Sequence, residues 1–382
     1  MDFSLNEDLS PLKRDEVIRF AQKELNVGLR EREKNGEFSR ENWEKCAQFG
    51  ILGLPIPTEY GGQNVDIVAI TAIMEALGYG CHDNGLIFAL NAQMWSVQLP
   101  ILTFGSEKQK EKYLPDLCNG KLIAAHGMTE PNSGSDAYSL STKAEKRNEG
   151  YILNGTKTFV GSAPIADIAV VFATVDPSQG IRGVTAFIVD TRSPGFVINR
   201  ELEKMGLRTH PMGELTFQDC FVPEENRLGP EGAGVGIFNH SMEWERSFIL
   251  ASCLGTMERQ LETCIQYAQK RRQFNQPIGK FQSVGNRIAD MKVRLETARL
   301  MLYKVAWLKK MKKSAVMEAA IAKLYLSECF VQSGLDAIRV HGGYGYLSEY
   351  EVERDLRDAL GGTLASGTSD IQRVIIAKWL GL

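Results

Sequence analysis

Residues 127–136 are small and hydroxylated, and they are the segment of the sequence best suited to hold a ligand. They read Gly-Met-Thr-Glu-Pro-Asn-Ser-Gly-Ser-Asp, with Ser133 and Ser135 on either side of Gly134. Backbone N–H groups in such a segment are open to a phosphate or a planar ring, because no bulky side chain covers them. The lysine of a G-x-x-x-x-G-K-[ST] phosphate loop is missing. A polar turn and a ligand cradle therefore both remain open interpretations.

Two further segments are also open to two interpretations. Residues 339–346 are rich in glycine and follow a helical pattern, so they suit either a helix end or a backbone that approaches a cofactor. No strand precedes them, as a Rossmann motif requires. Residues 270–274 end another helical pattern, where basic side chains complement the helix dipole. Arg271 alternatively offers a guanidinium fork to a phosphate.

Residues 242–246 read Met-Glu-Trp-Glu-Arg and lie near an expected helix start. A solvated acidic first turn is the simpler interpretation. Glu243 and Glu245 are two positions apart and point to different sides of a helix, so at most one of them faces a given site. If Glu245 faced an apolar pocket, it would be available as a general base.

Composition restricts the class of protein. The chain has 382 residues and a net charge of −3, which favours two or three domains and gives no reason to expect nucleic acid or an anionic membrane as partner. No apolar run reaches about 18 residues, so no transmembrane helix is expected. The acidic N-terminus lacks a signal-peptide pattern. Seven scattered cysteines and five dispersed histidines predict free thiols in a reducing compartment and no metal site.

The elements that would position these segments fall into three regions. Residues 1–121 are predicted to be helical, with one helix starting after Asp66 and another at the capping box of Ser106 and Gln109. Residues 122–230 contain strand-like runs at 151–153, 168–175, 183–191 and 215–222, and Asn154-Gly155 predicts a turn between two of them. Residues 231–382 return to a 3.6-residue period in long stretches, which predicts an antiparallel helical bundle. The longest of these apolar stripes consists of Val284, Ile288, Met291, Leu295, Ala298, Leu302 and Val305.

Several motifs taken together, in this order along the chain, resemble those of the acyl-CoA dehydrogenase family. The matching runs are residues 58–62, 127–136, 157–160, 203–208, 271–282, 342–346 and 367–373. The resemblance extends over essentially the whole chain. It implies an α+β multidomain protein with an N-terminal α-helical domain, a central β-barrel and a C-terminal four-helix bundle. It also implies non-covalent FAD and a homotetramer.

The resemblance assigns cofactor contacts to residues of this sequence. Met128 and Thr129 would contact the isoalloxazine ring, Gly134 and Ser135 the pyrophosphate, and Phe159 the other side of the ring. Further residues would reach the FAD of a neighbouring subunit or complete its site: Arg271, Gln273, Phe274, Gln282, Arg339, Gly342, Gly343, Thr368 and Asp370. Position 161 is Gly where the family usually has a Thr or Ser near flavin N5, and the missing hydroxyl could retune the redox potential or open the ring to oxygen. Arg339 replaces a usual Gln, and Asn275 replaces a usual Gly.

The family reaction is α,β-desaturation of an acyl thioester, in which a carboxylate takes the α proton and the β carbon delivers hydride to the flavin. Most members carry that base in a Tyr-Glu-Gly-Thr run, which here reads Ala-Ser-Gly-Thr at residues 365–368. The isovaleryl-type branch carries it instead on the helix before the first long bundle helix, where this chain has Glu245. The resemblance thus implies Glu245 as the base and the Ser366 backbone N–H as a donor to the thioester carbonyl. Trp244 and Arg246 are predicted to bind substrate.

Residues 163–167, 244–245, 257–262, 282–284 and 366–370 are similar to one branch of the family, the prolyl-carrier-protein dehydrogenases of natural-product assembly lines. Residues 205–210 look like those of ordinary acyl-CoA dehydrogenases. The expected substrate is an acyl or aminoacyl thioester on a carrier protein in secondary-metabolite biosynthesis. The alternatives are a short- or branched-chain acyl-CoA thioester and, because of Ser366, a flavin-binding protein without catalysis. An electron-transfer flavoprotein or oxygen would accept the electrons, in the cytoplasm.

Overall fold

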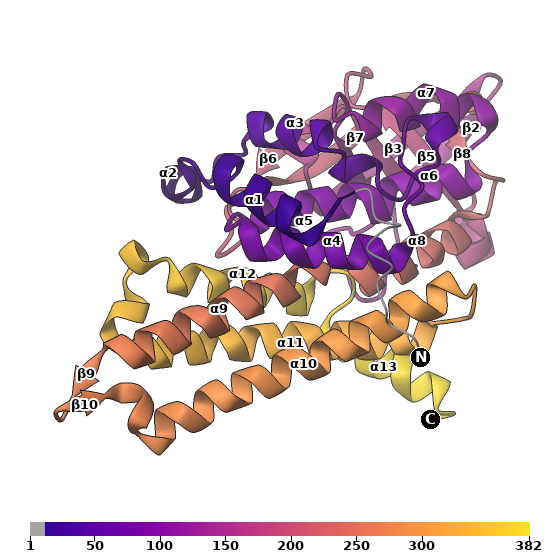
Figure 1. Cartoon of the computed structure of the whole chain (residues 1–382). Coiled ribbons are helices and arrows are strands. Elements are labelled where there is room, and N and C mark those ends of the chain that lie inside the picture. Colours follow the sequence, from indigo (N-terminus) through magenta and orange to yellow (C-terminus); the bar gives the residue numbers. More distant parts are fainter. Residues whose placement is uncertain (1–11) are drawn as a thin grey trace.

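The computed structural model describes residues 12–382, so the first eleven residues, including the acidic N-terminus, lie outside it. A helical region, a sheet and a second helical region follow one another along the chain (Figure 1). This order agrees with the three predicted regions. The family resemblance predicted the same succession of folds.

Helices form the N-terminal region. Their bounds are α1 Arg14–Glu24, α2 Leu29–Asn35, α3 Arg40–Gln48, α4 Ile67–Gly80, α5 Asn84–Ala92, α6 Leu99–Phe104 and α7 Glu107–Cys118. Asp66 caps α4 by accepting the Val68 N–H, and Ser106 with Gln109 forms the capping box of α7. Both predicted helix starts are therefore confirmed.

Between α5 and α6 the helix continues as a π-helix over Gln93–Gln98. The combined helix Asn84–Phe104 is long and apolar enough to cross a membrane by length and composition. However, 83% of its most apolar window is buried inside the protein, and Met94 and Trp95 belong to the core. Packing against the surrounding helices accounts for its apolar character.

The central region is one eight-stranded sheet. Its strands are β1 Ala124–Gly127, β2 Lys143–Arg147, β3 Gly150–Gly161, β4 Ile168–Thr174, β5 Val184–Asp190, β6 Phe196–Glu201, β7 Met212–Pro223 and β8 Arg227–Leu228. Their pairing follows the path β6-β7-β3-β2-β4-β5-β8, with β1 parallel to β4. Every residue of β4 is buried, because its side chains alternate between the two hydrophobic cores that cover the two faces of the sheet.

The predicted turn at Asn154-Gly155 is wrong, because both residues lie inside β3. The pairing register with β7 shifts between Leu153 and Gly155, so the local feature is a bulge. Asn154 exchanges two hydrogen bonds with Asp219 across the strands, at 3.0 and 2.9 Å. A Cβ at Gly155 would lie 2.5 Å from Thr142 Oγ1, which explains the glycine by close packing.

Long helices form the C-terminal region. Their bounds are α8 Gly234–Phe248, α9 Ala251–Lys270, α10 Gln282–Lys310, α11 Val316–His341, α12 Val352–Leu364 and α13 Ser369–Trp379. The stripe predicted on α10 is buried at Met291, Leu295, Ala298, Leu302 and Val305. A small hairpin, β9 Arg272–Gln273 and β10 Gln276–Pro277, lies at one tip of the bundle (Figure 1).

The N-terminal helices are fixed to the bundle where α4 crosses α9. A Cβ at Gly78 would come within 1.9 Å of Ser252 O, and a Cβ at Gly255 within 1.9 Å of Glu75 O. Only glycine at both positions allows the two backbones to approach so closely. Arg259 then donates to the carbonyls of Gly78, Tyr79 and Cys81 at 2.7–3.1 Å at the end of α4. The two helical regions are therefore mounted rigidly on one another.

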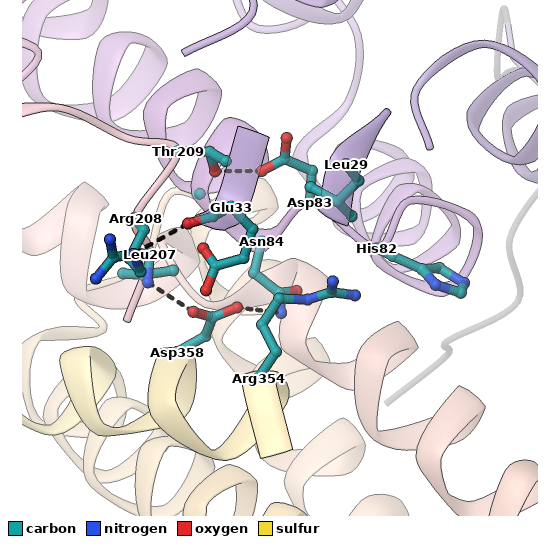
Figure 2. Close-up of a pocket in the computed structure, with 11 residues that line it drawn as sticks. Leu29, Glu33, His82, Asp83, Asn84, Leu207, Arg208, Thr209, Arg354 and Asp358 are labelled. Carbon is teal, nitrogen blue, oxygen red and sulfur yellow. Dashed lines mark hydrogen bonds between the residues drawn. The ribbon is translucent and has the colours of Figure 1, made fainter. Parts of the chain in front are cut away.

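All three regions meet at a buried polar junction, shown in Figure 2. Asp358 of α12 accepts the Leu207 N–H at 2.6 Å and the Asn84 side-chain amide at 3.0 Å. Thr209 donates to Asp83 at 2.5 Å. The side chains pack so closely that no room for a water molecule is left between them. Burial raises the pKa of Asp358 to about 7, and the neighbouring Asp355 charge adds to this effect.

We expect Asp358→Asn to gain stability relative to the wild type as the pH rises from 5 to 7. The unfolded chain releases the Asp358 proton near pH 4, whereas the folded protein retains it up to about 7. The wild type therefore loses folding free energy over this window, on the order of 1 kcal/mol per pH unit, and the asparagine variant does not. Thermal melting at pH 5, 6, 7 and 8 measures the difference. Asp290→Asn, on the exposed face of α10, is the control and should show no such trend.

Candidate active site

A buried ion pair holds the 127–136 loop in place. Lys157 of β3 donates to Glu130 at 2.8 Å and to the Met128 carbonyl at 3.1 Å, and neither charged side chain is more than 2% exposed. Glu130 also accepts the backbone N–H groups of Ser141 and Thr142. Burial alone would raise the pKa of Glu130, but the Lys157 charge and these hydrogen bonds lower it to about 2. The carboxylate is thus ionised, and it ties both ends of the loop to β3.

The loop and the adjacent strand leave an open surface. No other atom lies within 4 Å of the position that a Cβ would take at Gly134, and Ser135 is exposed. Phe159 is 65% exposed with a φ of +55°, at a register shift between Lys157 and Val160. Met128, in contrast, is 3% exposed, and its carbonyl accepts from the buried Lys157. Thr129 connects the two segments by accepting the Thr158 N–H at 2.9 Å.

The side-chain space at Gly161 is occupied by His210. A Cβ at this glycine would lie 2.7 Å from His210 Cε1 and 3.0 Å from Nε2. Burial lowers the pKa of His210 to about 3, assisted by the Lys204 charge, so the imidazole is neutral, and its Nε2 lies 3.1 Å from Ser162 Oγ. The missing hydroxyl at position 161 is therefore replaced by a packed ring and leaves no gap.

The carboxylate of Glu245 lies between two hydroxyl groups that come from distant parts of the chain. Ser96 on the π-helix donates to Oε2, and Ser366 in the loop after α12 donates to Oε1. Glu245 has no ion-pair partner among residues 12–382. π-helical turns are frequent at functional sites, and here the wider turn carries Ser96. Sequence reasoning missed Ser96, which stands in an apolar run without any motif.

Glu243 and Trp244 point away from this carboxylate, in agreement with the prediction that Glu243 and Glu245 face different sides. Glu243 pairs with Lys309 of α10, and that ammonium lies 4.6 Å from the Trp244 ring. The Trp244 ring stacks on Trp95 at 6.1 Å, and its N–H donates to His240 at 3.3 Å. The structure therefore places Trp244 in a packed aromatic cluster behind the site.

Side-chain donors from the helical bundle hold the backbone of the turn that carries Ser366. Ser366 and Gly367 both have positive φ, +57° and +84°. Arg246 donates to the Ser366 carbonyl at 3.3 Å, and Gln372 donates to the carbonyls of both turn residues at 3.3 and 2.8 Å. The Ser366 N–H has no acceptor within residues 12–382. That N–H is therefore free to donate to a ligand.

Aromatic residues and a histidine form the neighbouring wall. His126, just before the 127–136 loop, packs against Phe238 of α8 at 6.0 Å, and Tyr138 packs edge-on against the same ring. His126 Nε2 is buried and has no hydrogen-bond partner in the described part of the chain. Burial lowers the pKa of His126, against the opposing effect of the Glu245 charge. The sequence had offered no motif for His126.

The other predicted cofactor residues lie elsewhere in the same chain. Arg271, Gln273 and Phe274 belong to the β9–β10 tip, and Gln282 begins α10 beside it. Arg339, Gly342 and Gly343 lie at the end of α11. Arg339 is about 24 Å along the helix axis from Lys323, the residue of α11 on which the Glu245 charge acts. Phe274 is 88% exposed, and no other atom lies near the side-chain positions of Gly342 and Gly343. One chain therefore carries two separate exposed surfaces, as a site shared between subunits requires.

The remaining two predicted cofactor residues lie at the start of α13. Thr368 caps this helix by accepting the Ile371 N–H at 3.2 Å, and Asp370 pairs with Arg373.

These surfaces fit a large cofactor with a ring and a phosphate. The exposed Phe159 offers a face for stacking, and the bare backbone at Gly134 and Ser135 offers N–H donors without a blocking side chain. Arg271 at the second surface is exposed and lies over the Tyr344 ring at 5.7 Å. The chain thus presents an exposed aromatic ring and a bare backbone segment, and His126, just before that segment, lies close enough to Glu245 to feel its charge.

Comparisons with known proteins identify the same three regions. Models of the acyl-CoA dehydrogenase N-terminal, middle and C-terminal domains match residues 11–121, 125–220 and 232–381. An L-prolyl-[peptidyl-carrier protein] dehydrogenase of Pseudomonas fluorescens is 45% identical and covers 90% of this chain and 91% of its own. The crystal structure of the prolyl acyl carrier protein oxidase AnaB has a TM-score of 0.96 at 54% identity, covering 97% of this chain and 98% of that one. A structure of PigA with FAD and proline has a TM-score of 0.97 at 41% identity and covers all of both chains.

We expect Gly161→Thr to lower the melting temperature, because its side chain must displace the buried His210 ring. The double variant Gly161→Thr with His210→Ser should recover part of this loss, since serine leaves space for the threonine. His210→Ser alone should also be destabilised, by the cavity that remains. Thermal melting of the three variants gives a double-mutant cycle. Additive effects of the two substitutions would contradict the packing explanation.

Proposed function

Because this chain belongs to the acyl-CoA dehydrogenase family, we propose that it uses FAD to desaturate a prolyl group held as a thioester on a carrier protein. The observation that carries the proposal is the carboxylate of Glu245, which two hydroxyls orient and whose charge acts on His126 just before the 127–136 loop. The similarity to prolyl-carrier-protein dehydrogenases over nearly the full chain supports the substrate class. A homotetramer, a cytoplasmic location and a role in secondary-metabolite biosynthesis belong to the same proposal.

Glu245 acts as the base. Its carboxylate takes the proton from the prolyl α carbon, and FAD, when bound, accepts the hydride from the β carbon. The electron pair of the broken Cα–H bond becomes the new Cα–Cβ double bond, so the product is a dehydroprolyl thioester. Ser96 and Ser366 hold the carboxylate so that its oxygens keep one orientation, which favours proton transfer from a fixed position.

The acidity of the α proton depends on the thioester carbonyl. The unpartnered N–H of Ser366 is available to that oxygen, and Arg246 holds the turn by donating to the Ser366 carbonyl. Preorganised donors of this kind typically contribute about 3 kcal/mol each to stabilising a developing oxyanion. Ser366 therefore has two roles, through its hydroxyl and through its backbone.

Departure of the electrons completes the cycle, and the acceptor is either oxygen or an electron-transfer flavoprotein. The packed His210 behind Gly161 leaves no open channel at that position, so the hypothesis that the glycine admits oxygen receives no support from the packing. Further oxidation of the product toward a pyrrole would require reoxidised FAD and the loss of a proton from another ring atom, because the α carbon has no proton left.

We expect the FAD-loaded protein to be bleached under anaerobic conditions by prolyl-loaded carrier protein, and Glu245→Gln to retain FAD without bleaching. Loss of the base removes the acceptor of the α proton while leaving the cofactor surfaces intact. Stopped-flow absorbance of the flavin measures the rate. Glu243→Gln, two positions away on α8 and facing Lys309, is the matched control and should bleach like the wild type.

A parallel assay with isovaleryl-CoA separates the substrate classes. Bleaching by the CoA ester alone would replace the proposal with a branched-chain acyl-CoA dehydrogenase. A protein that no thioester of a broad panel bleaches would be a flavin-binding protein without this catalysis. Wild-type rates in Glu245→Gln would remove Glu245 from the mechanism.

A further inference from the structure

Lys323 is a buried lysine that the reaction described above does not use. It lies in the first third of α11 and is 1% exposed. No carboxylate lies within ion-pair distance of its ammonium in residues 12–382. Its one hydrogen-bond acceptor in that part of the chain is the Gly367 carbonyl, at 2.8 Å. An ammonium without a counter-ion is costly to bury, so a purely structural position would favour an apolar side chain.

The acceptor of this hydrogen bond belongs to the turn that forms the site. Ser366 is a non-glycine residue in the left-handed region, an unfavourable conformation that persists where its surroundings hold it. Three donors reach the two carbonyls of the turn from inside the bundle: Arg246 of α8, Lys323 of α11 and Gln372 of α13. With both carbonyls drawn inward, the backbone angles between them are fixed. The Ser366 hydroxyl and N–H then remain on the side of Glu245.

We propose that Lys323 is a positioning residue that holds the Ser366–Gly367 turn, so that Ser366 can orient Glu245 and present its N–H to the thioester carbonyl. The proposal rests on the proposed function for its catalytic consequence, but the hydrogen bond to Gly367 can be tested without turnover. Lys323 touches neither substrate nor base in this arrangement, since its single acceptor is the turn.

Charges around Lys323 make its contribution sensitive to pH. Burial lowers the pKa of Lys323 to about 8, and the like charge of Arg246 adds to this effect. Glu245 of α8 and Glu328 of α11 oppose it. Above pH 8 the lysine therefore becomes neutral, and its charge-assisted hydrogen bond to the carbonyl weakens to a neutral one.

The test uses the FAD-loaded full chain and the variant Lys323→Met, which keeps the volume and removes the donor. We expect FAD content to be unchanged and flavin reduction at saturating prolyl-carrier protein to fall roughly 100-fold, as expected for a misplaced site. The half-saturating concentration should stay within about threefold, because the contact acts on the chemical step. Lys292→Met, on the exposed face of α10, is the control and should keep the wild-type rate.

The pH dependence distinguishes positioning from packing. The wild-type reduction rate should fall above pH 8, whereas Lys323→Arg, whose charge persists at high pH, should hold its rate there. Gln372→Met, which removes the second donor to Gly367, should lower the rate without changing the pH profile. Gln372→Met also tests whether the turn needs its inward-facing donors if either lysine variant fails to fold. A wild-type rate in Lys323→Met would overturn the proposal.

Amide hydrogen exchange of residues 365–368 separates this proposal from the proposed function. Lys323→Met should speed exchange there in the FAD-loaded protein, even if prolyl-carrier protein does not bleach the wild type. In that case the substrate assignment fails and the positioning role stands. Unchanged exchange in the variant would refute the positioning role whatever the substrate.

Discussion

The carboxylate of Glu245 has no counter-ion in the described residues, so hydrogen bonds alone must stabilise it, and the arrangement of the helical regions depends on this requirement. A partly buried carboxylate needs hydrogen-bond donors on both oxygens, and these come from Ser96 in the N-terminal helical region and from Ser366 after α12. The two hydroxyls are correctly placed only if the N-terminal helices and the bundle keep a fixed relation. The glycine crossing of α4 and α9 and the buried junction around Asp358 provide that relation far from the carboxylate itself.

A second consequence of this constraint is local strain. Ser366 stands where most members of the family are expected to carry the base, and in this chain it donates to a carboxylate that comes from another helix. Its left-handed backbone is maintained by inward-facing donors, among them a lysine that has no other partner in the described residues. The turn now supplies both a hydroxyl and a backbone donor.

Local signals in the sequence predicted the elements well. The caps at Asp66 and Ser106 and the α10 stripe depend on residues a few positions apart, and the structure confirms them. The turn predicted at Asn154-Gly155 was wrong, because the glycine is required there by close packing against Thr142 and not by a turn. Ser96 and His210 were beyond prediction, since their roles come from partners 149 and 49 positions away. Lys323 had a detectable signal, a single charge within an apolar helical run, but its partner at Gly367 could not be inferred from spacing.

The π-helix at Gln93–Gln98 also affects the geometry of the helix beyond it. A π turn contains one residue more than the α turn it replaces, so the segments Asn84–Ala92 and Leu99–Phe104 are out of rotational phase by about 100°. The side chains of α5 and α6 therefore point in different directions around one continuous helix axis, and Ser96 lies in the π-helical turn where the direction changes. Loss of a single residue there would restore a uniform helix and rotate the hydroxyl away from Glu245. The hydrogen bond from Ser96 to Glu245 thus depends on the number of residues in this turn as well as on the serine side chain.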